Sequence, residues 1–328
     1  MQAKTTVGPL DRVKILFQAS NPQFQKYTGS WFGVFTAMRD IYRTDGSWGL
    51  FRGHSATLLR IFPYAGVKFL TYEQVRTLII TNPSEETPGR RFASGSIAGM
   101  MSVFSTYPLE VIRVRMAFET KAHTRTSLGE ICRRIYNERP APMRTTSTID
   151  TSSVSSAAVT TITKTTSAIS KATPSHGMSN FFRGFTPTLW GMIPYAGSSF
   201  LTHDTAGDLM RHPSIAQYTT LPPSQTRNRD PNKPVPLRYW AELLTGGFAG
   251  FVSQTVSYPL EVLRRRMQVG GVVGDGHRLG MIEVAGNIYR QAGVRGFFVG
   301  LTIGYVKVIP MVAVSFYVYE RGKLLLGI

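Results

Sequence analysis

One short charged pattern occurs three times in this chain, and its chemistry is ion pairing. Each copy reads proline, leucine, acid, two further residues and a base, at residues 9–14, 108–113 and 259–264. The acid and the base are three residues apart, so they share one face of a helix. The proline removes a backbone donor and kinks that helix, so we expect kinks at Pro9, Pro108 and Pro259. Three related helices allow each acid to meet the base of a neighbour.

A second set of residues stands three positions before another proline in each copy: Arg60, Gly191 and Lys307. Repeat symmetry predicts that they lie at one depth and face a common cavity. Arginine holds phosphate through paired donors and lysine adds a point charge, while Gly191 with Met192 offers a flat, uncharged slot for a purine ring. Lys68, two turns beyond Arg60, is a further phosphate candidate. The alternative for the two cations is snorkelling to a membrane interface.

The surroundings of these residues also repeat. Glycines seven residues apart follow each signature, at 46 and 53, 177 and 184, and 293 and 300. Ten residues separate the second proline from an acid in every copy. Such internal periodicity predicts three tandem αα-hairpins.

The hairpins have the lengths of membrane helices. Residues 92–109 and 187–203 contain no Lys, Arg, Asp or Glu, and a membrane crossing needs roughly 20 residues. Polar residues recur at helical spacing, as expected where one face lines water. Gly-x-x-x-Gly occurs at 95–99 and at 246–250, which lets membrane helices approach closely.

Composition limits the function classes. The net charge of +18 suits nucleic acid, anionic lipid or a polyanionic solute. The single cysteine, Cys132, excludes a disulfide framework, and the six histidines show no metal-hydrolase spacing. No nucleophilic triad or phosphate-binding loop is present, so we predict that the chain is not an enzyme.

The sequence resembles the mitochondrial carrier family, whose threefold P-x-[DE]-x-x-[KR] signature is carried by the three blocks described above. The resemblance implies an all-α membrane protein of six transmembrane helices in three tandem αα-hairpin repeats with pseudo-threefold symmetry. It also implies the mitochondrial inner membrane, a monomer, no cofactor, and cardiolipin as a structural lipid.

The family further implies a gate on the matrix side, formed by three ion pairs. These are Asp11 with Arg113, Glu110 with Arg264, and Glu261 with Lys14. The family's glutamine brace, nine residues after the signature proline, is present as Gln18 and Gln268 and is replaced by Ala117 in the second copy.

A second gate, on the cytoplasmic side, is implied by the family motif [FY]-[DE]-x-x-[KR]. The matching residues are Tyr72, Glu73 and Arg76, and then Tyr319, Glu320 and Lys323. In the second copy Asp204 is followed by Gly207 where a cation is expected. We therefore expect at most two of three pairs and a weaker cytoplasmic gate.

The copies predict repeats at 1–85, 86–221 and 222–328, with two departures. In residues 144–173, 17 of 30 residues are Ser or Thr; the insert at about 140–174 is therefore expected to be a disordered matrix loop. Only eight residues precede Pro9, so the first helix is expected to be truncated at its start.

The local sequence around these motifs is most similar to the coenzyme A carrier branch of the family. The expected function is transport of coenzyme A, adenosine 3′,5′-diphosphate or ADP by alternating access. The alternatives are an ATP-Mg/phosphate-type exchanger or a peroxisomal nucleotide carrier. A basic nucleic-acid-binding helical repeat is a further alternative, which the long uncharged segments disfavour.

Overall fold

The structure is a computed structural model that describes residues 2–29, 32–80, 87–120, 127–138, 177–221, 235–270 and 280–326. In these ranges the chain is helical, and the one pairing of extended backbone is an isolated bridge between Thr220 and Leu237. The Ser/Thr-rich insert predicted at about 140–174 lies outside the described residues. So do residues 222–234, at the start of the predicted third repeat.

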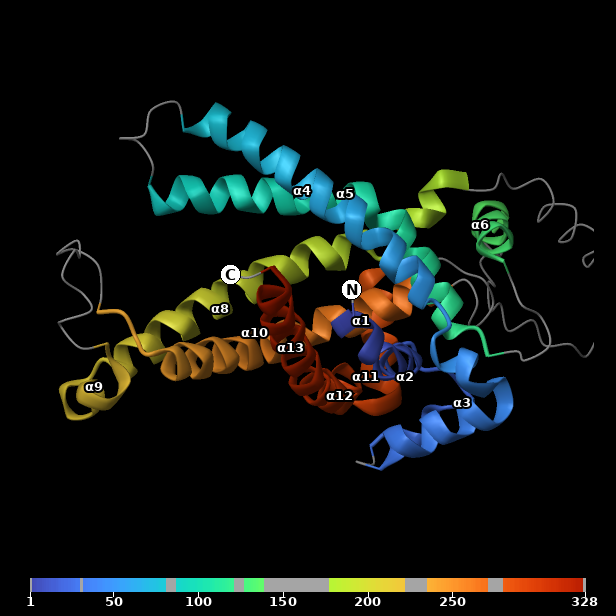
Figure 1. The fold of residues 1–328 in the computed structure, drawn as a ribbon. Helices are drawn as coiled ribbons and strands as arrows, with labels where there is room; N and C mark the ends of the chain where they lie inside the picture. Colours follow the sequence, from blue (N-terminus) through green and yellow to red (C-terminus); the bar gives the residue numbers. More distant parts are fainter. Residues whose placement is uncertain are drawn as a thin grey trace, which may run out of the picture. The chain divides into compact units, whose positions relative to one another are not determined.

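The helices follow one another in an order that repeats (Figure 1). They are α1 (Gln2–Thr6), α2 (Gly8–Gln18), η1 (Gln25–Tyr27), α3 (Gly33–Leu50), α4 (His54–Ile79), α5 (Pro88–Phe118), α6 (Leu128–Asn137), η3 (Gly177–Phe182), α8 (Phe185–Met210), α9 (Pro213–Thr219), α10 (Tyr239–Val269), α11 (Met281–Ala292), η5 (Val294–Phe298), α12 (Leu301–Val306) and α13 (Val308–Leu326).

The chain divides into two compact units. One comprises residues 1–186 with 262–328, and the other comprises residues 187–261. In the first unit α4 packs along α5 and α1 packs against α13. The second unit holds most of α8, all of α9 and the greater part of α10.

The prolines act in two ways on these helices. Pro108 and Pro259 lie inside α5 and α10, which continue through them. Pro9 instead stands in the first turn of α2, after a break at Val7. A similar break at Lys307 separates α12 from α13, just before Pro310. Proline cannot bond to the carbonyl four residues earlier, and its ring crowds that carbonyl, which accounts for the two breaks beside Pro9 and Pro310.

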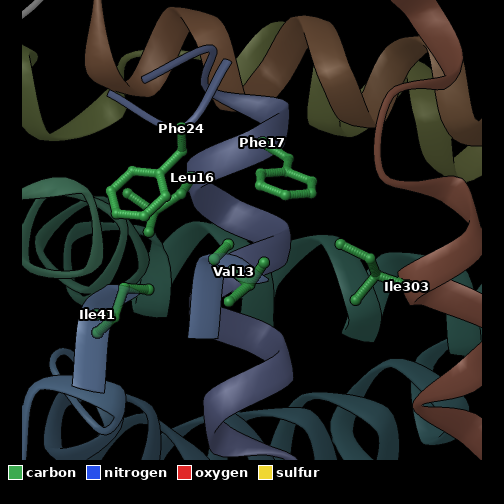
Figure 2. Close-up of a cluster of buried hydrophobic side chains, with 7 residues drawn as sticks. Val13, Leu16, Phe17, Phe24, Ile41 and Ile303 are labelled. Carbon is green, nitrogen blue, oxygen red and sulfur yellow. The ribbon is translucent and has the colours of Figure 1, made fainter. Parts of the chain in front are cut away.

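The core of the larger unit lies where the signature segments end. Val13, Leu16 and Phe17 of α2 pack with Phe24, Ala37 and Ile41 from the following hairpin and with Ile303 of α12. Figure 2 shows these side chains gathered around α2. A second cluster joins α2 to the last turns of α5 and α10 through Ile15, Val114 and Val269. The α2 helix therefore packs against elements of all three predicted repeats.

Two short amphipathic helices pack beside the longer ones, α6 against α5 and η3, and α11 against η5. Ile131 and Ile135 are the buried residues of α6, and Val284 and Ile288 are those of α11. The spacing of four residues in each pair places both side chains on one face. Among the described residues, one helical stretch, Val294–Leu324, is long and apolar enough by composition to cross a membrane.

Gly184 turns the chain into α8 in a conformation that only glycine adopts easily. Its φ is +78°, and a Cβ at this position would lie 2.9 Å from the carbonyl oxygen of Arg264 and 3.2 Å from the hydroxyl of Tyr107. Gly53, with φ of +83°, has the same relation to the carbonyl of Arg113. The repeated glycine spacing in the sequence thus reflects a close backbone approach.

Replacing Gly184 with alanine is expected to destabilise the protein by about 2 kcal/mol, because the substitution adds both backbone strain and a clash with a carbonyl. Thermal unfolding of the detergent-solubilised chain measures the effect. Gly129→Ala is the control, since a Cβ there meets nothing within 4 Å on the exposed face of α6. Equal melting of the two variants would contradict this account of Gly184.

Candidate functional site

Glu110 is the most buried acid of the predicted gate. Its side chain, on α5, is 2% exposed and is surrounded by arginines. Arg60 Nη1 lies 3.0 Å from Oε2, Arg265 Nη1 lies 3.1 Å from Oε1, and Arg264 also contacts Oε1. Arg264 is the partner that the resemblance implied. Arg60 and Arg265 were not expected here.

Asp11 forms the second carboxylate of the site. Arg113 Nη2 lies 3.1 Å from Oδ2, and Lys307 Nζ lies 3.2 Å from Oδ1. Arg113 is again the partner implied by the resemblance, whereas Lys307 was expected to face the substrate. The two cations of the predicted substrate site therefore each contact a gate acid.

Local structure explains why these groups meet. Glu110 follows Pro108 by two residues and Arg113 follows Glu110 by three, so one face of α5 presents both charges. Arg60 stands three residues before Pro63 inside α4, and α4 packs along α5. Lys307 stands at the interruption between α12 and α13. Glu110, Arg60 and Lys307 therefore each lie two or three residues from a proline.

The site carries a surplus of positive charge. Within the described residues, five cations contact two carboxylates. Charges held away from bulk water are costly unless they are paired. A site with more cations than acids is therefore suited to a solute that brings several negative charges of its own.

The third implied pair, Glu261 with Lys14, joins residues of the two units and stays a prediction. Of the predicted braces, Gln268 is fully buried and links the site to its surroundings. Its Nε2 donates to the Tyr107 hydroxyl at 3.1 Å, and its Oε1 accepts from Arg265 at 3.0 Å. Gln18 is also buried, at 1% exposure.

Gly191 and Met192 belong to the second unit, so their position relative to Arg60 is a prediction. Both are half-buried on α8. A Cβ at position 191 would lie 3.5 Å from Cβ of Leu260 on α10, an ordinary packing distance. Lys68 is exposed on α4.

The predicted cytoplasmic gate, which includes Asp204 of the second unit, stays a prediction. Glu73 and Glu320 are exposed, and neither forms an ion pair within the described part of the chain. The side chain of Tyr319 lies outside the described residues. In the second copy, His203 lies 3.8 Å from Asp204 and 3.5 Å from Glu242 of α10.

A cation does approach the position where the second copy has Gly207. A Cβ at Gly207 would lie 2.9 Å from Nη1 of Arg211, whose Nε donates to the Val235 carbonyl. The sequence pattern did not indicate Arg211, because it stands one turn beyond the motif. The charge missing from the motif is thus present nearby in the fold.

Two buried arginines that the sequence analysis missed tie one predicted repeat to the next. Arg12 donates to the Ala117 carbonyl at 3.3 Å and to the Glu119 carbonyl at 3.1 Å, and its Nη2 pairs with Asp45 at 3.2 Å. It also donates to the Gly49 carbonyl. The end of α5 is therefore capped by a side chain of α2.

Arg115 makes the corresponding connection from α5 to α10. Its Nε donates to the Gln268 carbonyl at 2.7 Å, and its Nη2 lies 3.1 Å from Glu138, which also pairs with Arg183 at 3.2 Å. The carbonyls at a helix C-terminus have no partner within the helix, so these bonds satisfy them.

The third copy departs from this arrangement. Arg266 stands seven residues after its signature proline, as Arg115 does, but the residue before Gly293 is Ala292 rather than an acid. Among the described residues, Arg266 forms no ion pair, and its Nη1 reaches Gln291 at 3.5 Å. The three copies are thus chemically unequal at this position.

Cys132 lies half-buried on α6, and burial raises the pKa of its thiol. A raised pKa leaves less thiolate at neutral pH, which is the opposite of what a nucleophilic cysteine requires. The described residues contain no group of His, Cys, Asp and Glu that could hold a metal ion.

Comparison with known proteins identifies the family. A sequence model described as mitochondrial carrier protein matches residues 1–83, 84–140, 142–214 and 235–328. The chain belongs to the mitochondrial carrier family. It is a multi-pass protein of the mitochondrial inner membrane, and the predicted all-α fold built of repeats is confirmed.

Three relatives of this carrier cover nearly all of it. It is 47% identical to "Mitochondrial carrier protein LEU5" of Saccharomyces cerevisiae, over 99% of this chain and 87% of that protein. It is 36% identical to human "Solute carrier family 25 member 16", over 98% and 83%. It is 33% identical to "Mitochondrial carrier protein CoAc2" of Zea mays, over 99% and 83%. Carriers of this family are transporters rather than enzymes.

Replacing Arg115 with glutamine is expected to lower the free energy of unfolding by about 3 kcal/mol, because it removes one partner from a buried ion pair and leaves a helix-end carbonyl unsatisfied. Thermal unfolding of the purified carrier measures it. Arg133→Gln, on the exposed face of α6, is the matched control and is expected to change stability by less than about 0.5 kcal/mol. An Arg115 variant as stable as the control would show that this connection contributes little.

Proposed function

We propose that this carrier transports coenzyme A, or a closely related adenine nucleotide such as adenosine 3′,5′-diphosphate or ADP, across the mitochondrial inner membrane by alternating access. The observation that carries the proposal is the surplus of cations at Asp11 and Glu110. Arg60 and Lys307 are the proposed substrate contacts, and Lys68 is a third. Each of these substrates carries phosphate groups that a cationic site of this kind attracts.

The chemistry of the two principal contacts fits phosphate. The planar guanidinium of Arg60 offers donors in a fork that matches a phosphate, and the ammonium of Lys307 adds a point charge. Both side chains are partly exposed, at 20% and 26%, so a solute can reach them. Gly191 and Met192 supply the proposed uncharged slot for the adenine ring.

The relatives support the substrate class. The maize relative bears the name CoAc2, which contains the usual abbreviation of coenzyme A. The proposed substrates share an adenine and at least two phosphate groups, so all of them suit a cationic site with an apolar slot.

The proposed transport cycle uses the two gates in turn. The matrix gate consists of Asp11, Glu110 and Glu261 with their bases, braced by Gln18 and Gln268. The cytoplasmic gate consists of Glu73 with Arg76, Glu320 with Lys323, and the unmatched Asp204, flanked by Tyr72 and Tyr319. Asp11 and Glu110 are paired, whereas Glu73 and Glu320 have no ion pair with any residue that the structure describes. That asymmetry is what a carrier with a closed matrix side and an open cytoplasmic side requires.

Uptake into liposomes tests the function. The full chain, reconstituted in vesicles loaded with unlabelled coenzyme A, is expected to take up labelled coenzyme A, and Arg60→Gln is expected to reduce the initial rate by at least about tenfold because a charge-assisted phosphate contact is lost.

The matched control for Arg60→Gln is Arg39→Gln, which removes the same charge from the exposed face of α3. Uptake of ADP without coenzyme A would redirect the substrate assignment within the nucleotides. Exchange of ATP-Mg for phosphate would favour the other branch of the family. Failure to take up any of these nucleotides would refute the proposal.

We also propose that cardiolipin binds the larger unit beside α12. A cavity of about 290 Å³ opens there, lined by apolar side chains and by Arg295. Its apolar lining comes from Phe17, Val34, Phe298, Val299 and Ile303. An apolar groove with a cation at its edge suits a lipid that has acyl chains and a phosphate headgroup, and the net charge of +18 favours anionic lipid in general.

Adding cardiolipin to the delipidated carrier is expected to raise its melting temperature by several degrees, because a ligand that binds the native state stabilises it. Arg295→Ala is expected to reduce that rise by at least half. Arg290→Ala, which removes another exposed cation, on α11, is expected to leave it unchanged. A rise that is the same in all three proteins would place the lipid elsewhere.

A further inference from the structure

Arg266, in the last turn of α10, is a partly buried arginine without an acid partner. Its Nε is buried and has no hydrogen-bond partner among the described residues. Within the same residues its guanidinium makes one hydrogen bond, from Nη1 to Oε1 of Gln291 on α11, and at 3.5 Å this bond is longer than an ordinary one. A cation that is partly removed from water is costly unless a negative group stands beside it.

The second copy shows the corresponding arginine with its counter-ion. Arg115 follows Pro108 by seven residues, as Arg266 follows Pro259. Its Nη2 lies 3.1 Å from Oε2 of Glu138, the residue that directly follows α6. In the second copy the charge of this arginine is therefore compensated within the chain.

Gln291 occupies the position of Glu138 in the third copy. Glu138 follows the buried Ile135 of α6 by three residues, and Gln291 follows the buried Ile288 of α11 by three. Glutamine has the length and shape of glutamate, but its amide carries no charge and includes two hydrogen-bond donors. The third copy thus keeps the arginine and the shape of its partner and lacks the negative charge.

The next residue does not supply that charge either. Ala292 stands before Gly293, where the first copy has Asp45 before its own glycine. Gln291 and Ala292 are exposed and Arg266 is half-buried, so a solute in the surrounding water can reach the pair. A guanidinium and an amide that both present N–H donors form a site that suits an oxyanion.

We propose that one phosphate-type oxyanion binds between Arg266 and Gln291 and takes the place of the carboxylate that Glu138 supplies in the second copy. The fork of the guanidinium matches two oxygens of a phosphate group, and the Gln291 amide donates to a third. One such group is enough, because Arg183, the second cation at Glu138, corresponds to Val299 in the third copy. This site is separate from the proposed substrate contacts and does not depend on which solute the carrier transports.

Two sources can supply the phosphate group. One is phosphate dissolved in the surrounding water. The other is the headgroup of an anionic lipid, because the cavity beside α12 is lined by Ala292, the residue after Gln291. Both present the same chemistry to Arg266, so inorganic phosphate and cardiolipin are used as separate probes.

The test is the melting temperature of the full-length carrier in lipid-free detergent, in phosphate and in chloride at equal pH and ionic strength. Phosphate is expected to raise it by about 2–4 °C, because an anion that binds the native state stabilises it. Arg266→Gln is expected to reduce this rise by at least half, and the remainder belongs to the cationic site at Arg60 and Lys307. Arg290→Gln, which removes an exposed cation from α11, is the matched control and is expected to keep the whole rise.

Gln291→Glu is the second variant, in case Arg266→Gln fails to fold. It supplies within the chain the charge that Glu138 supplies to Arg115. It is therefore expected to raise the melting temperature in chloride and to reduce the phosphate-dependent rise by at least half. Gln23→Glu adds the same charge at an exposed position elsewhere and is expected to leave the rise unchanged.

Cardiolipin added to the same proteins separates the two sources. A cardiolipin-dependent rise that falls in these variants, without a phosphate-dependent one that does so, would support the site and assign the bound group to a lipid. The reverse result would support the site and assign the group to dissolved phosphate. If neither probe gives a rise that each folded variant of Arg266 and Gln291 reduces, the proposal is overturned.

Discussion

The structure depends on how a carboxylate is kept charged where water is scarce. Glu110 is almost completely buried, and three arginines from two other helices converge on it. Burying a charge without partners would cost several kcal/mol, so the helices that carry those arginines must stay close to α5. The same requirement links Asp11 to α5 through Arg113 and to the start of α13 through Lys307. These ion pairs therefore hold together segments that are distant in the sequence.

Much of this arrangement could be predicted from the sequence, because the repeats constrain it. A proline two residues before an acid and five before a base recurs three times, which allows each acid to meet the base of a neighbour. The resemblance to the carrier family then implied the pairing of Asp11 with Arg113 and of Glu110 with Arg264. The glycines that enter α4 and α8 were equally visible as a spacing. Their reason, a close approach to a carbonyl of α5 or α10 in the next repeat, became apparent only in three dimensions.

Several residues of the site were not predicted from the sequence, and there is a physical reason for each omission. Arg12 and Arg115 bind backbone carbonyls, and a carbonyl leaves no mark in a sequence. Arg265 stands beside a signature base and outside the repeated pattern, so symmetry gave it no role, yet it reaches both Glu110 and Gln268. Arg60 and Lys307 were recognised as cations of the site but were assigned to the solute alone. A motif names one partner for each charge, whereas a buried carboxylate accepts several donors.

The three copies differ in whether an acid holds the arginine that connects one repeat to the next. Arg12 connects the first repeat to the second, and Arg115 connects the second to the third. An acid pairs with each arginine, Asp45 with Arg12 and Glu138 with Arg115. Ala292 offers no such anchor to Arg266 within the described part of the chain. Arg12 and Arg115 are therefore each held by an acid, whereas Arg266 is not held by one among the described residues, and the third repeat is joined to the first by the ion pair of Lys307 with Asp11.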